Sequence, residues 1–108
     1  MMSVRNEPPL KINIERETRA NTAYRNVIYT DDRMQVVLMS LSPGQEIGTE
    51  VHAQTTQFFR VEGKGRGVAL LQSPHTPTKI HSIALTDGVA FTVPFGYVHN
   101  VINTSDTD

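Results

Sequence analysis

The sequence predicts an all-β fold, either a sandwich or a small barrel. Short runs of apolar and β-branched residues alternate with turn signals built from glycine, proline and serine. Helical periodicity is almost absent along the chain. Several short strands at this spacing are typical of packed antiparallel sheets or of a closed barrel.

The N-terminal region is expected to begin as a loose tail. Pro8 and Pro9 block regular structure, so residues 1–9 are predicted to be flexible. One domain is predicted to follow over residues 10–108. Its first strand is expected at residues 12–14.

The middle of the chain predicts three strands. Residues 34–41 form an apolar run rich in β-formers, and residues 42–44 close it with a serine, a proline and a glycine. Residues 56–61 and 68–71 follow as two strands separated by closely spaced glycines. We expect these two strands to form a hairpin.

The C-terminal part repeats this arrangement. Residues 72–81 are rich in proline, serine and threonine and predict a loop that leads into a strand at residues 80–85. Residues 89–93 and 97–102 are predicted as strands on either side of the turn at residues 94–96. They are expected to form a second hairpin.

Composition and charge exclude several classes of protein. The chain has 108 residues, and ten Lys and Arg against eleven Asp and Glu give a formal net charge of −1. This balance offers no basic surface for nucleic acid, so none is expected as a partner. Cysteine is absent, which excludes disulfides, thiolate metal sites and thiol catalysis. Charged residues interrupt positions 1–20, so no signal peptide or membrane partner is predicted, and we expect a cytoplasmic protein.

Three polar side chains are candidates for a functional site. Glu50 and His52 are two residues apart, and side chains at positions i and i+2 of a strand point to the same face. A carboxylate and an imidazole can therefore converge on one point. His99 lies on a different predicted strand.

The second of these regions has a specific spacing. Gly88, Pro94, Gly96, His99 and Asn103 follow the pattern glycine-x5-proline-x-glycine-x2-histidine-x3-asparagine. This matches the second motif of the cupin family at every specified position. The glycines and the proline serve turns. The asparagine is interpreted as a residue that hydrogen-bonds backbone or a neighbouring strand, not as a ligand.

The first region is similar to the first cupin motif, with three departures. Its pattern is Gly44-x5-Glu50-x-His52-x4-Gln57-x5-Gly63. Glu50 stands where the family usually has a histidine, and Gln57 stands where it has a glutamate. The spacing to Gly63 is one residue short, in a predicted turn where a change of length costs little.

The resemblance covers residues 34–103 and implies a small single-domain cupin of bacterial type. Cupins are double-stranded β-helix, or jelly-roll, barrels that bring three histidines and a glutamate onto one divalent metal. Few residues follow the second motif here, so the barrel is expected to be short at its C-terminal end. An open edge favours pairing with another chain. We therefore expect a homodimer, with residues 11–15 suited to strand exchange.

Carried over position by position, the resemblance implies that the metal ligands are Glu50, His52, Gln57 and His99. The usual cupin ligand set and this one each contain one carboxylate, but here it comes from Glu50, at the position of the first histidine. Two imidazoles and a carboxylate are the ligand types of non-haem Fe(II) sites, and Mn, Ni, Co or Zn can occupy the same ligands. Gln57 is expected to add a weak carbonyl ligand or a supporting hydrogen bond. A decayed site that binds no metal tightly is the alternative.

Three further residues are candidates for substrate binding. Phe59 shares the face of Gln57 and can wall an apolar cavity. Tyr97 precedes His99 by two residues and can line the mouth of the pocket, with simple packing on the turn as the alternative. Arg60 alternates with Phe59 and is expected to point outward, whereas an inward guanidinium would hold a substrate carboxylate.

These expectations favour a metal-dependent oxidoreductase of dioxygenase type that acts on a small organic molecule. A metal-dependent isomerase or decarboxylase comes next, because one fold hosts many reactions. A module that binds a sugar or carboxylate without turnover, and a subunit with a vestigial site, remain open. Glu50 is the candidate catalytic base where it is not a ligand.

Overall fold

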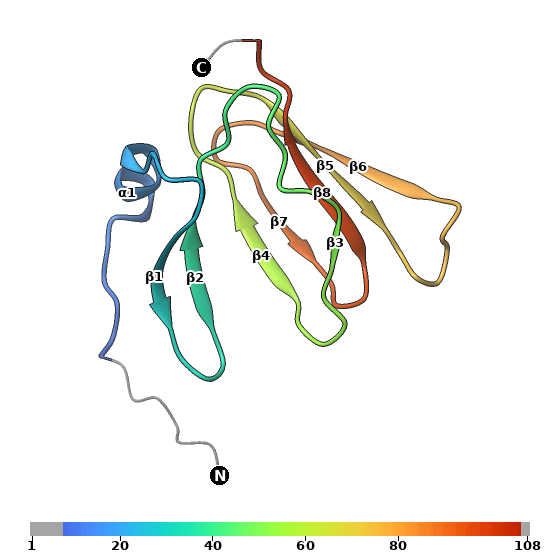
Figure 1. Cartoon of the computed structure of the whole chain (residues 1–108), viewed down its shortest axis with the longest axis horizontal. Coiled ribbons are helices and arrows are strands. Elements are labelled where there is room, and N and C mark those ends of the chain that lie inside the picture. Colours follow the sequence, from blue (N-terminus) through green and yellow to red (C-terminus); the bar gives the residue numbers. More distant parts are fainter. Residues whose placement is uncertain (1–7, 107–108) are drawn as a thin grey trace. The chain divides into compact units, whose positions relative to one another are not determined.

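The computed structural model describes residues 8–106, so the predicted tail at residues 1–9 falls largely outside the described residues. The chain divides into two compact units, one ending at Ser40 and the other starting at Leu41. Antiparallel strands form both units, and the first also holds one short helix (Figure 1). This confirms the predicted all-β class, while the single domain over residues 10–108 stays a prediction. Within the described part of the chain, no helix is long and apolar enough to cross a membrane.

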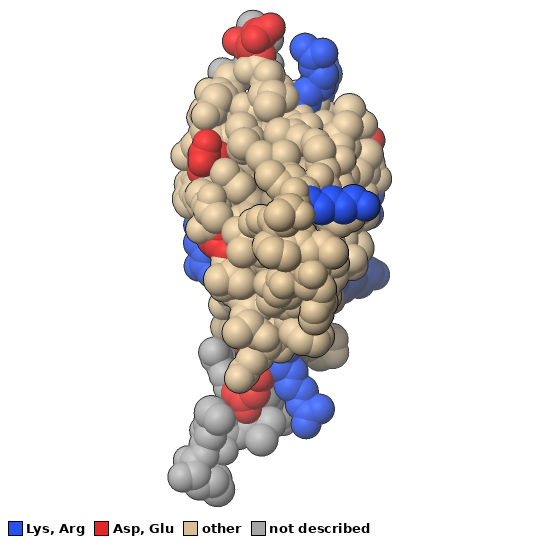
Figure 2. All heavy atoms as spheres, turned by 90° about the vertical axis from the view of Figure 1, so that its right-hand side faces the viewer, with Lys and Arg blue, Asp and Glu red and all other residues tan. Residues whose placement is uncertain are grey.

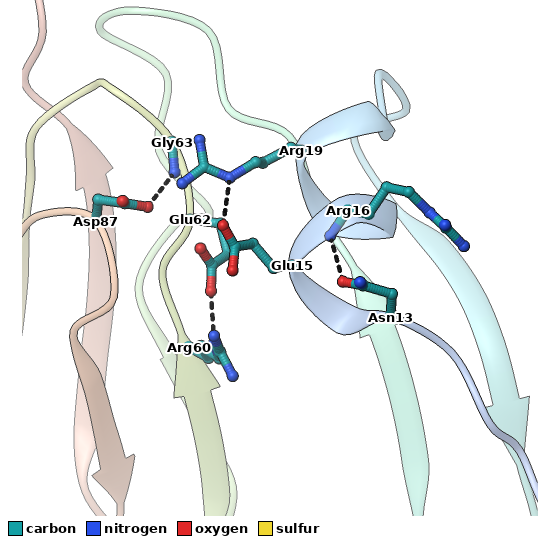
Figure 3. A network of polar contacts seen from close by, with 8 residues as sticks. All are labelled: Asn13, Glu15, Arg16, Arg19, Arg60, Glu62, Gly63 and Asp87. Atoms are coloured by element: carbon teal, nitrogen blue, oxygen red, sulfur yellow. Dashed lines mark hydrogen bonds and ion pairs between the residues drawn. The ribbon is translucent and has the colours of Figure 1, made fainter.

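The first unit begins with helix α1 (Ile14–Ala20), so the strand predicted at residues 12–14 is wrong. The side-chain oxygen of Asn13 caps the helix by accepting a hydrogen bond from the backbone N–H of Arg16 at 3.0 Å (Figure 3). Two glutamates lie in the first turn, where carboxylates interact favourably with the helix dipole. These local helix signals outweigh the apolar alternation. Residues 11–15 therefore do not form the strand that an exchange between chains requires.

Strands β1 (Asn26–Thr30) and β2 (Gln35–Leu38) form an antiparallel hairpin in the same unit. Strand β2 confirms the strand predicted within residues 34–41, in a shorter form. Strand β1 was not among the predicted elements. It is half exposed, and its register with β2 is irregular between Val27 and Tyr29. The alternation of apolar and polar residues that indicates a strand is therefore weak in this segment.

Asp31 closes the turn between these two strands. Its Oδ1 accepts hydrogen bonds from the backbone N–H groups of Arg33 and Met34, both at 2.8 Å. Its Oδ2 accepts a hydrogen bond from the hydroxyl of Tyr29, also at 2.8 Å. The bond from Arg33 contributes most to holding the pKa of Asp31 below its ordinary value of 3.8, because each of these bonds favours the charged carboxylate.

The described residues of the second unit, up to position 106, form six strands in two antiparallel sheets. The four-stranded sheet has the order β3-β8-β5-β6, and the two-stranded sheet pairs β4 with β7 (Figure 1). Strand β6 coincides with the strand predicted at residues 80–85. The strands are β3 (Glu50–Val51), β4 (Gln57–Arg60), β5 (Gly67–Gln72), β6 (Ile80–Leu85), β7 (Ala90–Val93) and β8 (Val98–Asn103).

The two predicted hairpins are wrong, although the strands that compose them are present. Strand β4 pairs with β7 and not with β5, and β8 pairs with β3 and β5 and not with β7. The glycine-rich connection after β4 and the turn after β7 carry the chain from one sheet to the other. Turn residues indicate that the chain changes direction, but they do not specify which sheet the next strand joins.

The core of the second unit lies between its two sheets. Both sheets contribute inward-facing side chains at every second position, as expected for packed antiparallel layers. Burying one large apolar side chain of this kind contributes about 1.5–3 kcal/mol. The buried residues are Ala69, Leu71 and Leu85 from the four-stranded sheet and Phe91 and Val93 from the two-stranded sheet.

Asn103 ends β8 and connects it to the segment that precedes β3. Its side-chain amide donates a hydrogen bond to the carbonyl of Leu41 at 2.7 Å. The backbone carbonyl of Asn103 accepts a hydrogen bond from the N–H of Gly44 at 2.8 Å. Gly44 has a φ of +82°, in the left-handed region that favours glycine. The interpretation of Asn103 as a hydrogen-bonding structural residue is confirmed.

Candidate metal centre

Glu50 and His52 face each other at the end of strand β3. The Oε2 atom of Glu50 lies 3.1 Å from the Nε2 atom of His52. Their side chains are 43% and 40% exposed, so this side of the site is open to solvent. The spacing of two residues in extended backbone therefore brings the carboxylate and the imidazole together, as predicted.

His99 completes the group from strand β8. It stands directly opposite Glu50 in the antiparallel pairing of β3 with β8, and it is 1% exposed. Its ring centroid lies 5.7 Å from that of His52. One potential ligand atom from each of the three residues lies within 4.8 Å of the other two. The group therefore has a buried side at His99 and an accessible side at Glu50 and His52.

The orientation of the His99 ring leaves one nitrogen available. Its Nδ1 lies 3.4 Å from the carbonyl oxygen of Tyr97, the hydrogen-bond acceptor that a protonated Nδ1 would use. In that tautomer Nε2 carries the lone pair. This Nε2 is buried and has no hydrogen-bond partner among the described residues. A metal-ligating histidine commonly has this arrangement, with one ring nitrogen held by the backbone and the other free to bind.

Gln57 presents a second buried acceptor that has no partner among the residues the structure describes. It lies on β4, and its Oε1 makes no hydrogen bond within the described part of the chain. Gln57 shares its face of β4 with Phe59. The ring of Phe59 contacts the ring of His99 edge-on, with the ring centroids 6.3 Å apart. A buried polar atom without a partner costs roughly 1–3 kcal/mol. A bound cation would remove this penalty for a carbonyl oxygen and for an imidazole nitrogen alike.

The predicted substrate-binding residues lie on two different faces. Phe59 is half-buried, stacks on Phe91 with ring centroids 4.8 Å apart, and also contacts His99. Tyr97 packs against the core cluster. Arg60 lies on the other face of β4, 43% exposed, and its Nε donates to Glu62 at 2.5 Å (Figure 3). Phe59 is therefore close to His99, and Arg60 points away from it, as expected.

Two contacts that support the site were not predicted. The N–H of Gly96 donates a hydrogen bond to the carbonyl of His52 at 2.7 Å. The N–H of Phe95 donates to the hydroxyl of Thr56 at 3.2 Å. Together they attach the turn after β7 to the segment that carries His52. The partners lie about forty positions apart in the sequence, so no local pattern signals the contacts.

Comparison with known proteins places the chain among relatives of mixed origin. No protein-family profile matches it. It is 38% identical over 99 residues to the uncharacterized protein YrkC of Bacillus subtilis, covering 92% of this chain and 52% of that protein. It is 39% identical over 97 residues to the uncharacterized protein L612 of Acanthamoeba polyphaga mimivirus, covering 90% and 58%. The chain thus spans little more than half the length of these relatives.

Solved structures are similar over most of the fold. The crystal structure of BH2720 from Bacillus halodurans has a TM-score of 0.82 and 40% identity, covering 93% of this chain and 74% of that one. A cupin domain from Bordetella pertussis, bp2299, has a TM-score of 0.54 and 33% identity, covering 79% and 82%. Both likenesses extend beyond the two short motifs.

Proposed function

This chain belongs to the cupin family, and we propose that it binds one divalent transition-metal ion and acts with it on a small organic molecule. Its antiparallel sheets and its likeness to a solved cupin domain agree with the jelly-roll fold of that family. Cupins bind metals between their sheets, and the group formed by Glu50, His52 and His99 can hold such an ion. The proposal concerns this site.

The observation that carries the proposal is the buried Nε2 of His99, which has no hydrogen-bond partner among residues 8–106 and lies beside two further ligand-type side chains. His99 is 1% exposed, and packing alone does not explain a buried imidazole nitrogen without a hydrogen-bond partner among the described residues, because buried polar groups are normally hydrogen-bonded. Glu50 and His52 offer a carboxylate oxygen and a second ring nitrogen within reach. We assign these three residues as ligands, and Gln57 as a carbonyl ligand or a supporting hydrogen-bonding residue.

The ligand types restrict the metal. Imidazole and carboxylate donors suit Fe, Mn, Ni and Zn, and the absence of thiolates argues against Cu(I). Two histidines and one carboxylate are the donor types of non-haem Fe(II) oxygenases. A metal held in this way would supply open positions on the exposed side, where a small substrate can bind and O2 can be activated.

We therefore favour a dioxygenase-type reaction, in which Glu50, His52 and His99 hold the metal and the apolar ring of Phe59 limits access of water from the core side. An isomerase or decarboxylase would use the same ligands, because open coordination positions serve these reactions equally. Where Glu50 does not bind the metal and the histidines alone hold it, the exposed carboxylate of Glu50 would act as the general base.

One contact favours a second candidate function. The carboxylate of Glu50 and the ring of His52 already hydrogen-bond to each other at 3.1 Å, so both have a partner without a metal. This arrangement is compatible with a cupin that captures a sugar or a carboxylate and does not transform it. Binding without turnover is therefore the alternative that the experiment has to separate. We also expect a homodimer, and the cytoplasmic location stays a prediction.

Oxygen consumption by the reconstituted protein tests the proposal. The whole chain is loaded separately with Fe(II), Mn(II), Ni(II) and Zn(II) and assayed with small phenols and 2-keto acids. We expect oxygen uptake with a redox-active metal, its loss in His52→Ala, and its retention in His75→Ala, which changes an exposed histidine outside the site. Saturable binding of these compounds without oxygen uptake in any metal form would reject the dioxygenase and favour the binding module.

A further inference from the structure

One row of side chains crosses the four-stranded sheet from the candidate metal centre to strand β6. In an antiparallel pair, residues directly opposite each other point to the same face. His99 stands opposite Glu50 on one side and opposite Leu71 on the other, and Leu71 stands opposite His81. The row therefore follows the strand order β3-β8-β5-β6 that Figure 1 shows, and it ends at His81.

The packing of β6 places His81 on the inner face of the sheet, the face that lines the core. Ile83 and Leu85, two and four positions further along the strand, both pack into the core. Side chains alternate between the two faces of a strand, so His81 points to the same side as these two residues. His81 itself is exposed. Two strand spacings, about 10 Å, separate its backbone from that of His99.

Two residues lie beside this row at the open end of the sheet. Ser73 follows β5 and is 6% exposed, and Tyr97 precedes β8 and packs against the core cluster. The Oγ atom of Ser73 accepts a hydrogen bond from the N–H of His75 at 3.1 Å, so its hydroxyl hydrogen is available to another acceptor. Leu71 is 4% exposed, so a molecule that reaches from the metal centre to His81 has to pass over this open end.

The connection between β5 and β6 makes this end of the sheet cationic. Residues 72–85 contain Lys79 and two histidines and no Asp or Glu. Lys79 is exposed immediately before β6, and within residues 8–106 neither its ammonium group nor the ring of His81 forms an ion pair. Figure 2 views the molecule from the side of Figure 1 on which β6 lies, and most of the visible surface belongs to residues other than Lys, Arg, Asp and Glu. Few carboxylates on that side can neutralise Lys79.

Contacts hold this connection close to the candidate metal centre. The side-chain amide of Gln72 donates a hydrogen bond to the carbonyl of Pro77, and the N–H of Lys79 donates to the carbonyl of Thr76 at 3.0 Å. Pro74 lies against Gly96, in the turn whose N–H binds the carbonyl of His52. The segment that carries Lys79 is therefore attached to the turn that also positions a proposed metal ligand.

From these observations we propose that His81 and Lys79 bind a carboxylate group of the substrate while the metal holds its other end, an assignment that rests on the proposed function. An imidazole N–H and an ammonium group are donors that hold a carboxylate, and the hydroxyl of Ser73 is a third. Glu50, at the other end of the row, repels an anionic group, so the substrate binds in one orientation. The substrate class is a small molecule with a metal-binding head and a carboxylate tail.

Two matched probe molecules test the proposal on the whole chain loaded with Fe(III). Protocatechuate is a catechol with a carboxylate on the side of the ring away from its metal-binding hydroxyls, and protocatechuamide carries a neutral amide there. A catechol bound to Fe(III) gives a visible absorption band, which reports the binding of either probe. In the unmodified chain we expect protocatechuate to bind about tenfold more tightly than the amide, because hydrogen bonds to a charged group are the stronger ones.

Variants of the two cationic residues show whether they cause this preference. His81→Ala and Lys79→Gln should each reduce the ratio of the two affinities, and the double variant should bring it to about one. His81→Lys should keep the preference, and His81→Glu should reverse it. His75→Ala is the control, because it changes another exposed histidine of the same connection, and it should bind both probes like the unmodified chain. All variants should retain the same iron content and the same affinity for the amide.

Two kinds of result would overturn the proposal, and they differ in what they say of the metal centre. Equal affinity of the two probes in the unmodified chain, or a preference for protocatechuate that persists in His81→Glu, would remove His81 from substrate binding and leave the metal centre in place. Failure to retain iron, or the absence of an absorption band with either probe, would reject the proposed function, and the role of His81 would be rejected with it.

Discussion

Glu50 and His99 stand directly opposite each other on the neighbouring strands β3 and β8. The relative position of a carboxylate and an imidazole from two distant motifs is thus set by the register of one short strand pair. Val51 and Val98 form the adjacent pair, and β3 contains no further residues. The site therefore depends on contacts outside β3 for its stability, chiefly the turn that contacts His52.

Gly96→Ala tests that dependence. Gly96 has a φ of +83°, and a side chain there costs about 1–2 kcal/mol. Because its N–H bonds to the carbonyl of His52, strain at Gly96 should also displace His52 and weaken metal binding. Gly88→Ala is the matched control, with a φ of +84° and open space for a methyl group. Urea denaturation and metal titration should show a similar loss of stability in both variants, with weaker metal binding in Gly96→Ala alone.

Gln57 allows the contribution of a neutral ligand position to be measured. Gln57→Ala should weaken metal binding by about 10- to 100-fold, the usual effect of removing a supporting residue at a metal site. Gln57→Glu should strengthen it, because a second carboxylate adds attraction for the cation. The control is Gln54→Ala, at an exposed position of the loop before β4. Competition with a chromophoric chelator measures the affinities. Equal affinity in all variants would exclude Gln57 from the site.

Asn103→Asp tests the structural role of that residue. An aspartate keeps the acceptor that binds the N–H of Ser105 but cannot donate to the carbonyl of Leu41. We expect a loss of about 1–3 kcal/mol in the free energy of unfolding, since a half-buried carbonyl loses its donor. Chemical denaturation monitors the change. Unchanged stability would mean that the side chain does not hold β8 to the segment before β3.

The β1–β2 turn should loosen in acid. The pKa of Asp31 is lowered in the folded chain, so the stability contributed by its carboxylate is present above its ordinary value of 3.8 and is lost as the pH falls through the folded pKa. Tyr29→Phe removes one donor and should raise the pKa of Asp31 part of the way back. An NMR titration of the Asp31 carboxyl, with exchange of the Arg33 and Met34 amides, checks this. An unchanged pKa in Tyr29→Phe would contradict it.

Part of the site and one strand can be predicted from the sequence because neighbouring residues determine them. The i, i+2 spacing of Glu50 and His52 was enough to predict that they converge, and the spacing from Gly88 to Asn103 identified the strand that carries His99. The uninterrupted run at residues 80–85 predicted β6 at the observed bounds.

Other parts depend on contacts between distant residues and could not be read locally. The partner of each strand is set by packing across the core, so β4 joins β7, about thirty residues away, and not the next strand. The apolar alternation at residues 12–14 predicts a strand, whereas the chain forms a helix there because Asn13 caps it and glutamates occupy its first turn. The Nε2 of His99 and the Oε1 of Gln57, which lack hydrogen-bond partners in the described part of the chain, can be identified only when burial is known.

The metal content of the purified chain tests the central claim most directly. Elemental analysis after dialysis against a weak chelator should find close to one Fe, Mn, Ni or Zn per chain in the unmodified protein and in His75→Ala. It should find little in His52→Ala and His99→Ala. His52 is partly exposed, so its variant should stay folded even if the buried His99 does not tolerate truncation. No metal in the unmodified chain, even after reloading, or equal metal in all four proteins, would contradict a metal centre at Glu50, His52 and His99.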